Sequence, residues 1–149
     1  RSLEALVPSW GPDPTPVEID FSENASSVSV NGAHRAYPDV RVEREVAFRF
    51  RKGFTVRDRV EGAESEPHIA RWHFEYGVEV QRDGTGFIAK FARGALRVST
   101  SEGGRARLYR DNRWLRRNPA RPGEAAPWVL DVKFGGEGKD ELETRFEIV

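Results

Sequence analysis

Two charged residues interrupt otherwise apolar rows in neighbouring segments, and they are the first candidates for chemistry. Arg44 and Asp58 each stand at a position where the alternation of the chain calls for an apolar side chain. A turn at residues 51–53 would set Phe50 opposite Phe54, which makes the two charges diagonal neighbours on one face. A buried charge costs several kcal/mol unless it is paired. The pattern therefore predicts either a structural ion pair between Arg44 and Asp58 or a site in which Asp58 is a ligand or an orienting residue.

The histidines offer a second kind of chemistry. His34 precedes Tyr37 by three residues, and His73 precedes Tyr76 by the same spacing. A His/Tyr pair can transfer protons, but residues three apart on a strand point to opposite faces, so we assign no catalytic residue in this chain. His73 and Asp58 together are the candidate metal ligands, although two ligands alone make neither a structural nor a catalytic zinc site.

An arginine-rich segment, RLYRDNRWLRRNPAR, covers residues 107–121 and contains two aromatic side chains and one acid. Guanidinium groups bind carboxylates and sulfates in a bidentate manner, and aromatic faces stack on sugar rings or bases. The segment therefore predicts a site for an anionic glycan or a single-stranded nucleic acid. The alternative is a solvated edge whose arginines pair with glutamates. The candidate ligand-binding residues are Arg107, Arg110, Arg113, Trp114 and Arg116.

The elements that would position these residues are short strands. Apolar and polar residues alternate over 40–50 and 54–60, which is typical of half-buried strands. Glycine-rich turns separate further segments of the same kind. These segments are Val17–Phe21, Ser27–Asn31, Ile69–Phe74, Val78–Arg82, Phe87–Phe91, Ala95–Thr100, Arg105–Asp111, Trp128–Phe134 and Leu142–Val149. About ten or more short strands predict an all-β fold, an antiparallel β-sandwich, with a closed barrel as the alternative.

Length and composition limit what this domain can do. A chain of 149 residues suits one domain, with the proline-rich residues 1–16 as a linker or lead-in and residues 17–149 as the sandwich. The absence of cysteine excludes disulfides and thiolate zinc sites. The 24 basic and 24 acidic residues cancel, and no apolar run approaches the roughly 20 residues of a membrane helix. We therefore expect neither nucleic acid nor a membrane as a partner.

Several short motifs occur together in the stretches NGAHRAYPDVRVEREVAFRFRKGFTVRDRVEG and PHIARWHFEYGVEV. They lie at His34–Tyr37, Val42–Arg44, Val56–Gly62 and Trp72–Gly77. In order and spacing they resemble the C-terminal β-sandwich of heparinase II/III-like polysaccharide lyases. The tail PWVLDVKF…ELETRFEIV is similar to the closing strands of that family. The resemblance covers roughly residues 25–149.

The resemblance implies a bacterial multidomain protein in which an (α/α) toroid precedes this sandwich. Such proteins cleave acidic, uronate-containing polysaccharides such as glycosaminoglycans by β-elimination, with most of the catalytic groups on the toroid. Some members hold zinc through His, Asp and His. Asp58 and His73 match two of these ligands, whereas the first histidine falls on Val42, which can neither bind a metal nor move a proton. Ala36 likewise replaces a glycine of the family pattern.

These expectations define a domain that depends on the rest of its protein. Its implied partners are its own toroid and an acidic polysaccharide, zinc is the one cofactor under consideration, and its implied location is periplasmic or extracellular. The isolated domain is expected to be inactive. A chain that begins at Arg1, without an initiator methionine, fits a fragment of a longer protein. The alternative function is a non-catalytic β-sandwich that binds glycans or another protein.

Overall fold

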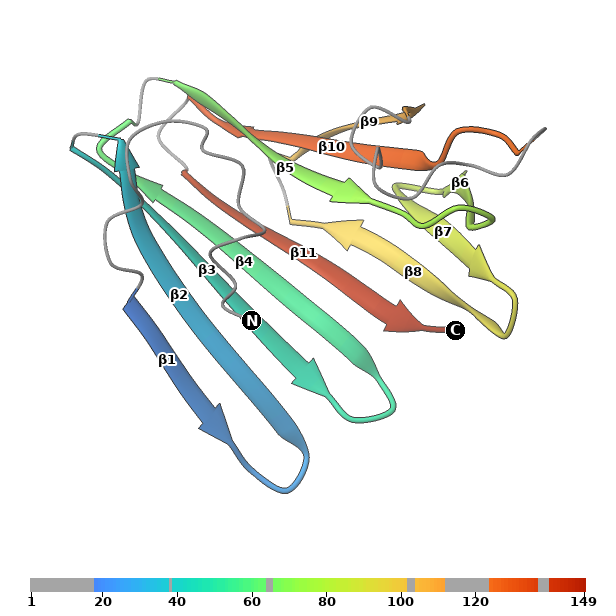
Figure 1. Cartoon of the computed structure of the whole chain (residues 1–149), viewed down its shortest axis with the longest axis horizontal. Coiled ribbons are helices and arrows are strands. Elements are labelled where there is room, and N and C mark those ends of the chain that lie inside the picture. Colours follow the sequence, from blue (N-terminus) through green and yellow to red (C-terminus); the bar gives the residue numbers. More distant parts are fainter. Residues whose placement is uncertain (1–17, 38, 64–65, 102–103, 112–123, 137–139) are drawn as a thin grey trace, which may run out of the picture.

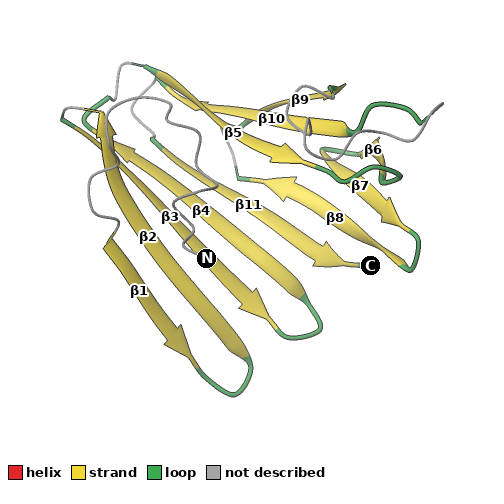
Figure 2. Ribbon diagram, viewed as in Figure 1, coloured by secondary structure: helices red, strands yellow, loops and turns green. Residues whose placement is uncertain are grey.

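The fold is an antiparallel assembly of strands, which confirms the expected fold class. The computed structural model describes residues 18–149 except 38, 64–65, 102–103, 112–123 and 137–139, and these residues form strands and loops without a helix (Figure 2). The described residues accordingly include no apolar helix of membrane-spanning length. The strands are β1 (Glu18–Glu23), β2 (Ser27–Tyr37), β3 (Val40–Arg49), β4 (Gly53–Glu61), β5 (Pro67–His73), β6 (Glu79–Asp83), β7 (Gly86–Phe91), β8 (Gly94–Thr100), β9 (Arg105–Arg110), β10 (Trp128–Gly135) and β11 (Glu141–Ile148).

The strands form two sheets of unequal size. The larger sheet has eight strands in the order β1-β2-β3-β4-β11-β8-β7-β6, and the smaller has three in the order β5-β10-β9. Figure 1 shows the three-stranded sheet along one side of the molecule, while β1 and β2 extend away from it at the opposite end. The smaller sheet therefore covers only part of the larger one. The linker expected over residues 1–16 lies outside the described residues and stays a prediction.

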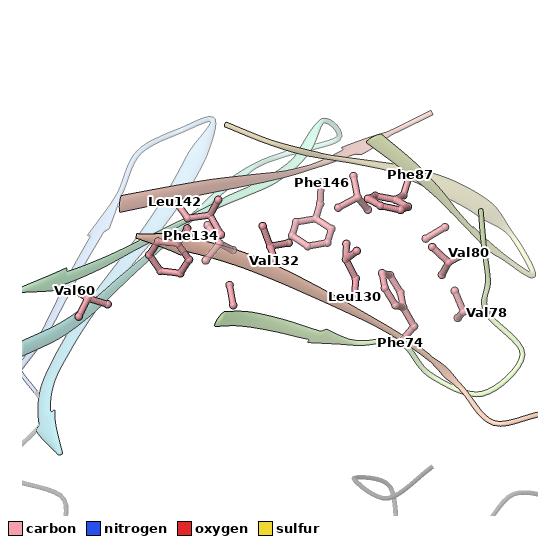
Figure 3. Packing of buried hydrophobic residues seen from close by; sticks show 14 residues of the cluster. Val60, Phe74, Val78, Val80, Phe87, Leu130, Val132, Phe134, Leu142 and Phe146 are labelled. Carbon is pink, nitrogen blue, oxygen red and sulfur yellow. The ribbon is translucent and has the colours of Figure 1, made fainter. Parts of the chain in front are cut away.

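The hydrophobic core lies between the two sheets (Figure 3). Alternation along β10 directs Leu130, Val132 and Phe134 inward, where they meet Leu142 and Phe146 from β11. Burial of a side chain of this size stabilises a fold by about 1.5–3 kcal/mol. The buried members of this cluster are Val56, Val60, Ala70, Phe74, Val78, Val80, Phe87, Ala89, Val98, Leu130, Val132, Phe134, Leu142 and Phe146.

The β3–β4 hairpin has a register that differs by two residues from the expected one. Phe54 pairs with Phe48 rather than with Phe50, and Gly53 pairs with Arg49. The turn closes early because the Lys52 amide donates to the Arg49 carbonyl at 3.0 Å. Gly53 belongs to the strand, where its φ of 125° and the proximity of the Phe146 carbonyl leave no room for a Cβ atom.

Candidate functional site

The corrected hairpin register places Arg44 directly opposite Asp58 on the inner face of the larger sheet. Arg44 Nε donates to Asp58 Oδ1 at 2.6 Å, and Arg44 Nη2 donates to Asp58 Oδ2 at 3.1 Å. The Asp58 side chain is only 8% exposed, whereas that of Arg44 is 47% exposed. The fork of two hydrogen bonds satisfies a buried carboxylate while its partner reaches toward water. The structure thus brings together the two charges singled out in the sequence, in direct rather than diagonal pairing.

An aromatic side chain from the other sheet completes the surroundings of Arg44. Trp72 of β5 lies beneath the guanidinium, with its ring centroid 5.2 Å from Arg44 Cζ. The same indole makes a T-shaped contact with the Phe146 ring, at a centroid distance of 5.0 Å. Cation–π contact with the indole adds to the ion pair with Asp58. Arg44 therefore connects the two sheets at the border of the core.

A second pair of titratable groups lies at the same end of the interior, and sequence reasoning missed it. His68 Nε2 and Asp140 Oδ1 are 3.5 Å apart, and both side chains are largely buried. Neither atom has a hydrogen-bond partner among the described residues. A cavity of about 420 Å³ lies beside His68 and reaches Arg44 and Asp58. Asp140 occupies a loop, so no periodicity could have connected it with His68.

The candidate metal ligands Asp58 and His73 are not brought together. Asp58 faces the interior, whereas alternation along β5 turns Trp72 and Phe74 inward and leaves His73 exposed on the outer face. Both oxygens of Asp58 already accept hydrogen bonds from Arg44. The described residues contain no group of three His, Asp or Glu side chains able to hold a metal. These residues do not fit the zinc site that the family resemblance implies.

Alternation also separates the described residues of the arginine-rich segment. Arg110 lies over the Trp128 ring at 4.2 Å and binds both carboxylate oxygens of Glu79 at 3.1 Å. Arg107, three positions earlier, lies over the ring of Tyr109 at 5.1 Å. Arg107 and Arg110 fall on opposite parities of β9 and do not form one surface. Arg113, Trp114 and Arg116 lie outside the described residues, so their roles as ligand-binding residues stay predictions.

A network on the outer face of the smaller sheet was not anticipated. Arg71 donates to both oxygens of Asp131, at 2.7 and 2.9 Å, and the Tyr109 hydroxyl donates to Asp131 Oδ2 at 3.1 Å. These three residues come from β5, β10 and β9, with Asp131 in the middle strand. The one signal in the sequence was the acid in the apolar run WVLDVKF, which calls for a partner that sheet pairing then supplies.

The electrostatics of this network follow from its hydrogen bonds and partial burial. The hydrogen bonds from Arg71 hold the pKa of Asp131 below its usual range. Burial, followed by the hydrogen bond to Asp131, raises the pKa of Tyr109. Burial and the nearby Arg71 guanidinium lower the pKa of His73, so its neutral form is favoured. The face therefore holds an ionised Asp131 neutralised by Arg71, beside a neutral phenol and imidazole.

Comparisons with known proteins agree with this architecture. The family model described as heparinase II/III-like, C-terminal, matches residues 6–141. No curated protein matches the chain. A solved heparinase III superposes with a TM-score of 0.69 at 14% identity, over 89% of this chain and 21% of that one. Heparan sulfate lyase HepC from Pedobacter heparinus superposes with a TM-score of 0.66 at 12% identity, over 89% of this chain and 22% of that one.

These solved structures share the fold of this chain, which spans about a fifth of their length. The match to the family model covers most of the chain, from before β1 to the first residue of β11. The chain belongs to the family of heparinase II/III-like C-terminal domains.

Proposed function

We propose that this chain is the C-terminal β-sandwich of a polysaccharide lyase, where it supports the cleft of an N-terminal (α/α) toroid domain. The lyase would act on acidic, uronate-containing polysaccharides by β-elimination. In that reaction a base removes the proton from the carbon beside the uronate carboxylate. The glycosidic oxygen on the next carbon then leaves and takes up a proton, which produces an unsaturated uronate. Membership of the family over residues 6–141 is the observation that carries this proposal.

The larger sheet offers a surface on which such a toroid could pack. Register places Ile19, Phe21 and Phe48 on the inner face of β1–β3, continuous with the core but beyond the smaller sheet. All three side chains are exposed in this domain. Contiguous apolar surface of this kind marks interaction sites in soluble proteins. We propose that the toroid covers it, which accounts for a supporting domain with an unfinished second layer.

The chemistry of this chain supports a structural contribution more than a catalytic one. Its carboxylates at Asp58 and Asp131 are each occupied by an arginine fork. The fork at Asp131 lowers the pKa of that carboxyl group, which makes it a poor proton acceptor. We therefore expect the proton-transfer groups on the toroid. Because acidic polysaccharides of this kind occur outside the cytoplasm, we also propose a periplasmic or extracellular location.

Absorbance of the unsaturated uronate tests the proposal directly. This chain and the full-length protein would each be incubated with heparin, chondroitin sulfate and alginate. We expect the full-length protein to generate the chromophore on at least one substrate and this chain to generate none. Turnover by this chain alone, or no turnover by the full-length protein on any uronate-containing polysaccharide, would overturn the proposal.

A second candidate function is a non-catalytic module that binds glycans. The outer face of the smaller sheet favours it, since Arg107 and Lys133 lie exposed there on either side of the Arg71–Asp131 pair. A glycan array would show binding by this module even where the full-length protein has no lyase activity. Loss of that binding on replacing Arg113 and Trp114 with Ala would assign it to the arginine-rich segment.

A further inference from the structure

A cleft of about 380 Å³ lies on the outer face of the larger sheet, beside the turn between β3 and β4. Figure 1 shows this turn at the end of the hairpin that points away from the smaller sheet. Small residues form the floor of the cleft, because Ala47 pairs with Thr55 across the two strands and Gly53 lies in the next row. Charged side chains stand around this floor. The cleft is therefore of a size that can hold a small ligand.

At one end of the cleft the charged side chains neutralise one another. Arg57 Nε donates to Glu143 Oε2 at 3.0 Å, and Arg57 Nη1 lies 3.7 Å from Glu45 Oε2. Arg145 Nε donates to Glu143 Oε1 at 2.6 Å. Two arginines and two glutamates thus form a connected network without net charge. Because the network joins β3, β4 and β11, it holds this end of the cleft in place.

The end of the cleft next to the turn has cations without such partners. Arg49 and Lys52 are exposed, and neither forms an ion pair within the described part of the chain. Glu147 of β11 is the one other carboxylate among the lining residues, and it too has no ion pair there. Arg97, the neighbour of Glu147 on β8, lies 3.7 Å from Asp83 instead. Two cations and one carboxylate at this end are therefore available to a ligand.

Backbone hydrogen bonds hold the turn that presents the two cations. The Lys52 amide donates to the Arg49 carbonyl at 3.0 Å, and the Ile148 amide donates to the Lys52 carbonyl at 2.9 Å. The Phe50 amide donates to the Ser26 carbonyl at 3.1 Å, which ties the turn to the neighbouring β1–β2 turn. Groups held in place before binding lose less conformational entropy on binding.

From this arrangement we propose that the cleft binds an acidic sugar residue, with its carboxylate or sulfate at Arg49 and Lys52 and its hydroxyl groups at Glu147. A guanidinium binds such anions through parallel hydrogen bonds, and an ammonium attracts them as a point charge. An ionised carboxylate only accepts hydrogen bonds, so Glu147 suits sugar hydroxyls and disfavours a second anionic group. The mixed charge therefore favours a sugar acid over a row of phosphates.

The cleft would stay accessible in the full-length protein. Ala47 lies in the cleft and Phe48 in the apolar surface assigned to the toroid, and consecutive residues of a strand point to opposite faces. The toroid and the sugar would thus occupy different faces of the larger sheet. The choice of an acidic sugar as ligand rests on the proposed function, whereas the cleft and its charges do not.

The test is binding of this chain to tetragalacturonate, which carries carboxylates, and to a heparin tetrasaccharide, which adds sulfates, measured by calorimetry at physiological ionic strength. The double variant Arg49→Ala, Lys52→Ala should lose about tenfold or more in affinity for at least one of them. The matched control, Lys90→Ala, Arg93→Ala, removes the same charges from the β7–β8 hairpin and should change affinity less than about twofold, because salt screens distant exposed charges.

Two further comparisons separate the cleft from its charge. Ala47→Phe keeps every charge and suits a strand but fills the floor, so it should weaken binding by about tenfold or more. Ala95→Phe, on the outer face of β8 and outside the cleft, is its control and should change affinity less than about twofold. Fully methyl-esterified tetragalacturonate keeps the sugar ring but loses the charge, and it should bind about tenfold more weakly than the acid.

Four outcomes would overturn the inference. Equal losses in the two double variants would indicate long-range charge alone. Unchanged affinity in the Arg49/Lys52 or Ala47 variant, with circular dichroism showing that it is folded, would place binding elsewhere. Equal binding of the methyl ester and the acid would remove the role of the cations. Tighter binding of single-stranded DNA than of either sugar through Arg49 and Lys52 would assign the cleft to nucleic acid.

Lyase activity of the full-length protein is measured separately, so the two proposals can fail independently. Sugar binding at the cleft without turnover of any uronate-containing polysaccharide would overturn the proposed function alone. Turnover by the full-length protein, without binding of either tetrasaccharide at the cleft, would overturn the present inference alone.

Discussion

The inner face of the eight-stranded sheet has two halves that alternate in the same way but differ in what lies above them. In the half under the smaller sheet, Leu142 is 0% exposed and Phe146 is 4% exposed. In the other half, formed by β1, β2 and the end of β3 that carries Phe48, Phe48 is 46% exposed and Phe21 is 63% exposed. In both halves most of the inner-face positions, which recur at every second residue of a strand, are apolar. The difference shows that alternation defines the faces of a sheet but not whether a second layer covers them.

The border between the two halves is marked by a charge pair. Arg44 and Asp58 occupy inner-face positions on β3 and β4, where the smaller sheet ends above the larger one. Trp72 of the smaller sheet reaches Arg44, while much of the guanidinium remains in contact with solvent. The Asp58 side chain is buried with the covered half, whereas the Arg44 side chain extends toward the uncovered half and is partly exposed. Substitutions on either side of this border test whether the contribution of a side chain to stability depends on coverage by the smaller sheet.

The largest effect is expected in the covered half. Leu142→Ala should lower the free energy of unfolding by about 3–5 kcal/mol, because it removes a fully buried side chain and leaves a cavity between the sheets. Urea denaturation followed by circular dichroism measures this loss. Val28→Ala, on the inner face of the uncovered half, is the control and should cost less than about 1 kcal/mol. A similar loss of unfolding free energy in the two variants would show that the two halves do not differ in burial.

An intermediate effect is expected at the border. Arg44→Ala should lower the free energy of unfolding by about 1–3 kcal/mol, because it leaves the buried Asp58 carboxylate without its two hydrogen bonds. The control is Arg57→Ala, which breaks exposed ion pairs of the outer face and should cost at most about 1 kcal/mol. Thermal denaturation at neutral pH compares the stabilities of the two variants. An Arg44 variant as stable as the Arg57 variant would show that Asp58 does not depend on its partner.

A smaller effect of opposite sign is expected within the covered half. Thr144 is fully buried and its hydroxyl has no hydrogen-bond partner among the described residues. Thr144→Val should therefore raise the free energy of unfolding by about 1 kcal/mol, since the desolvated hydroxyl is replaced by a methyl group. Thr55→Val, on the outer face of β4, should change it little. A destabilised Thr144→Val protein would indicate that the hydroxyl is hydrogen-bonded in solution.

The smallest effect on stability is expected in the uncovered half. Phe21→Thr keeps strand propensity and should change the free energy of unfolding by less than about 0.5 kcal/mol, because the ring is already exposed. The same substitution should weaken association with a separately produced N-terminal toroid domain, measured by calorimetry. Ser22→Thr, on the opposite face of β1, is the control and should leave association unchanged. Loss of stability without loss of association would show that Phe21 is covered within this domain.

The strands themselves were predictable, whereas the details of pairing were not. Each segment identified from alternation and turn residues contains a strand in the structure, including the hairpin that carries Arg44 and Asp58. The predicted register of that hairpin was wrong by two residues. The turn closes between Arg49 and Lys52, and Gly53 belongs to the strand. Turn geometry depends on hydrogen bonds and on the neighbouring Phe146 backbone, which the local sequence does not specify.

The contacts at the candidate sites were likewise predictable only in part. An ion pair between Arg44 and Asp58 could be inferred, because two charges on adjacent apolar rows have few other partners. The network of Arg71, Asp131 and Tyr109 could not, since its members are separated by 60 and 22 residues. Asp58 and His73 do not meet, because Asp58 faces the interior between the sheets whereas His73 lies on the outer face of the smaller sheet.

The sequence by itself determined the strands, the two faces of each strand, and the positions at which charge enters an apolar row. These properties depend on neighbours within a few residues, whose steric and solvation preferences set a local period of two. The tertiary structure alone decided that the smaller sheet ends at β3, where Trp72 meets Arg44, and that cations from β9 and β10 gather on one face. Such properties depend on which distant strands pair, and that choice minimises exposed apolar area and unpaired charge over the whole chain.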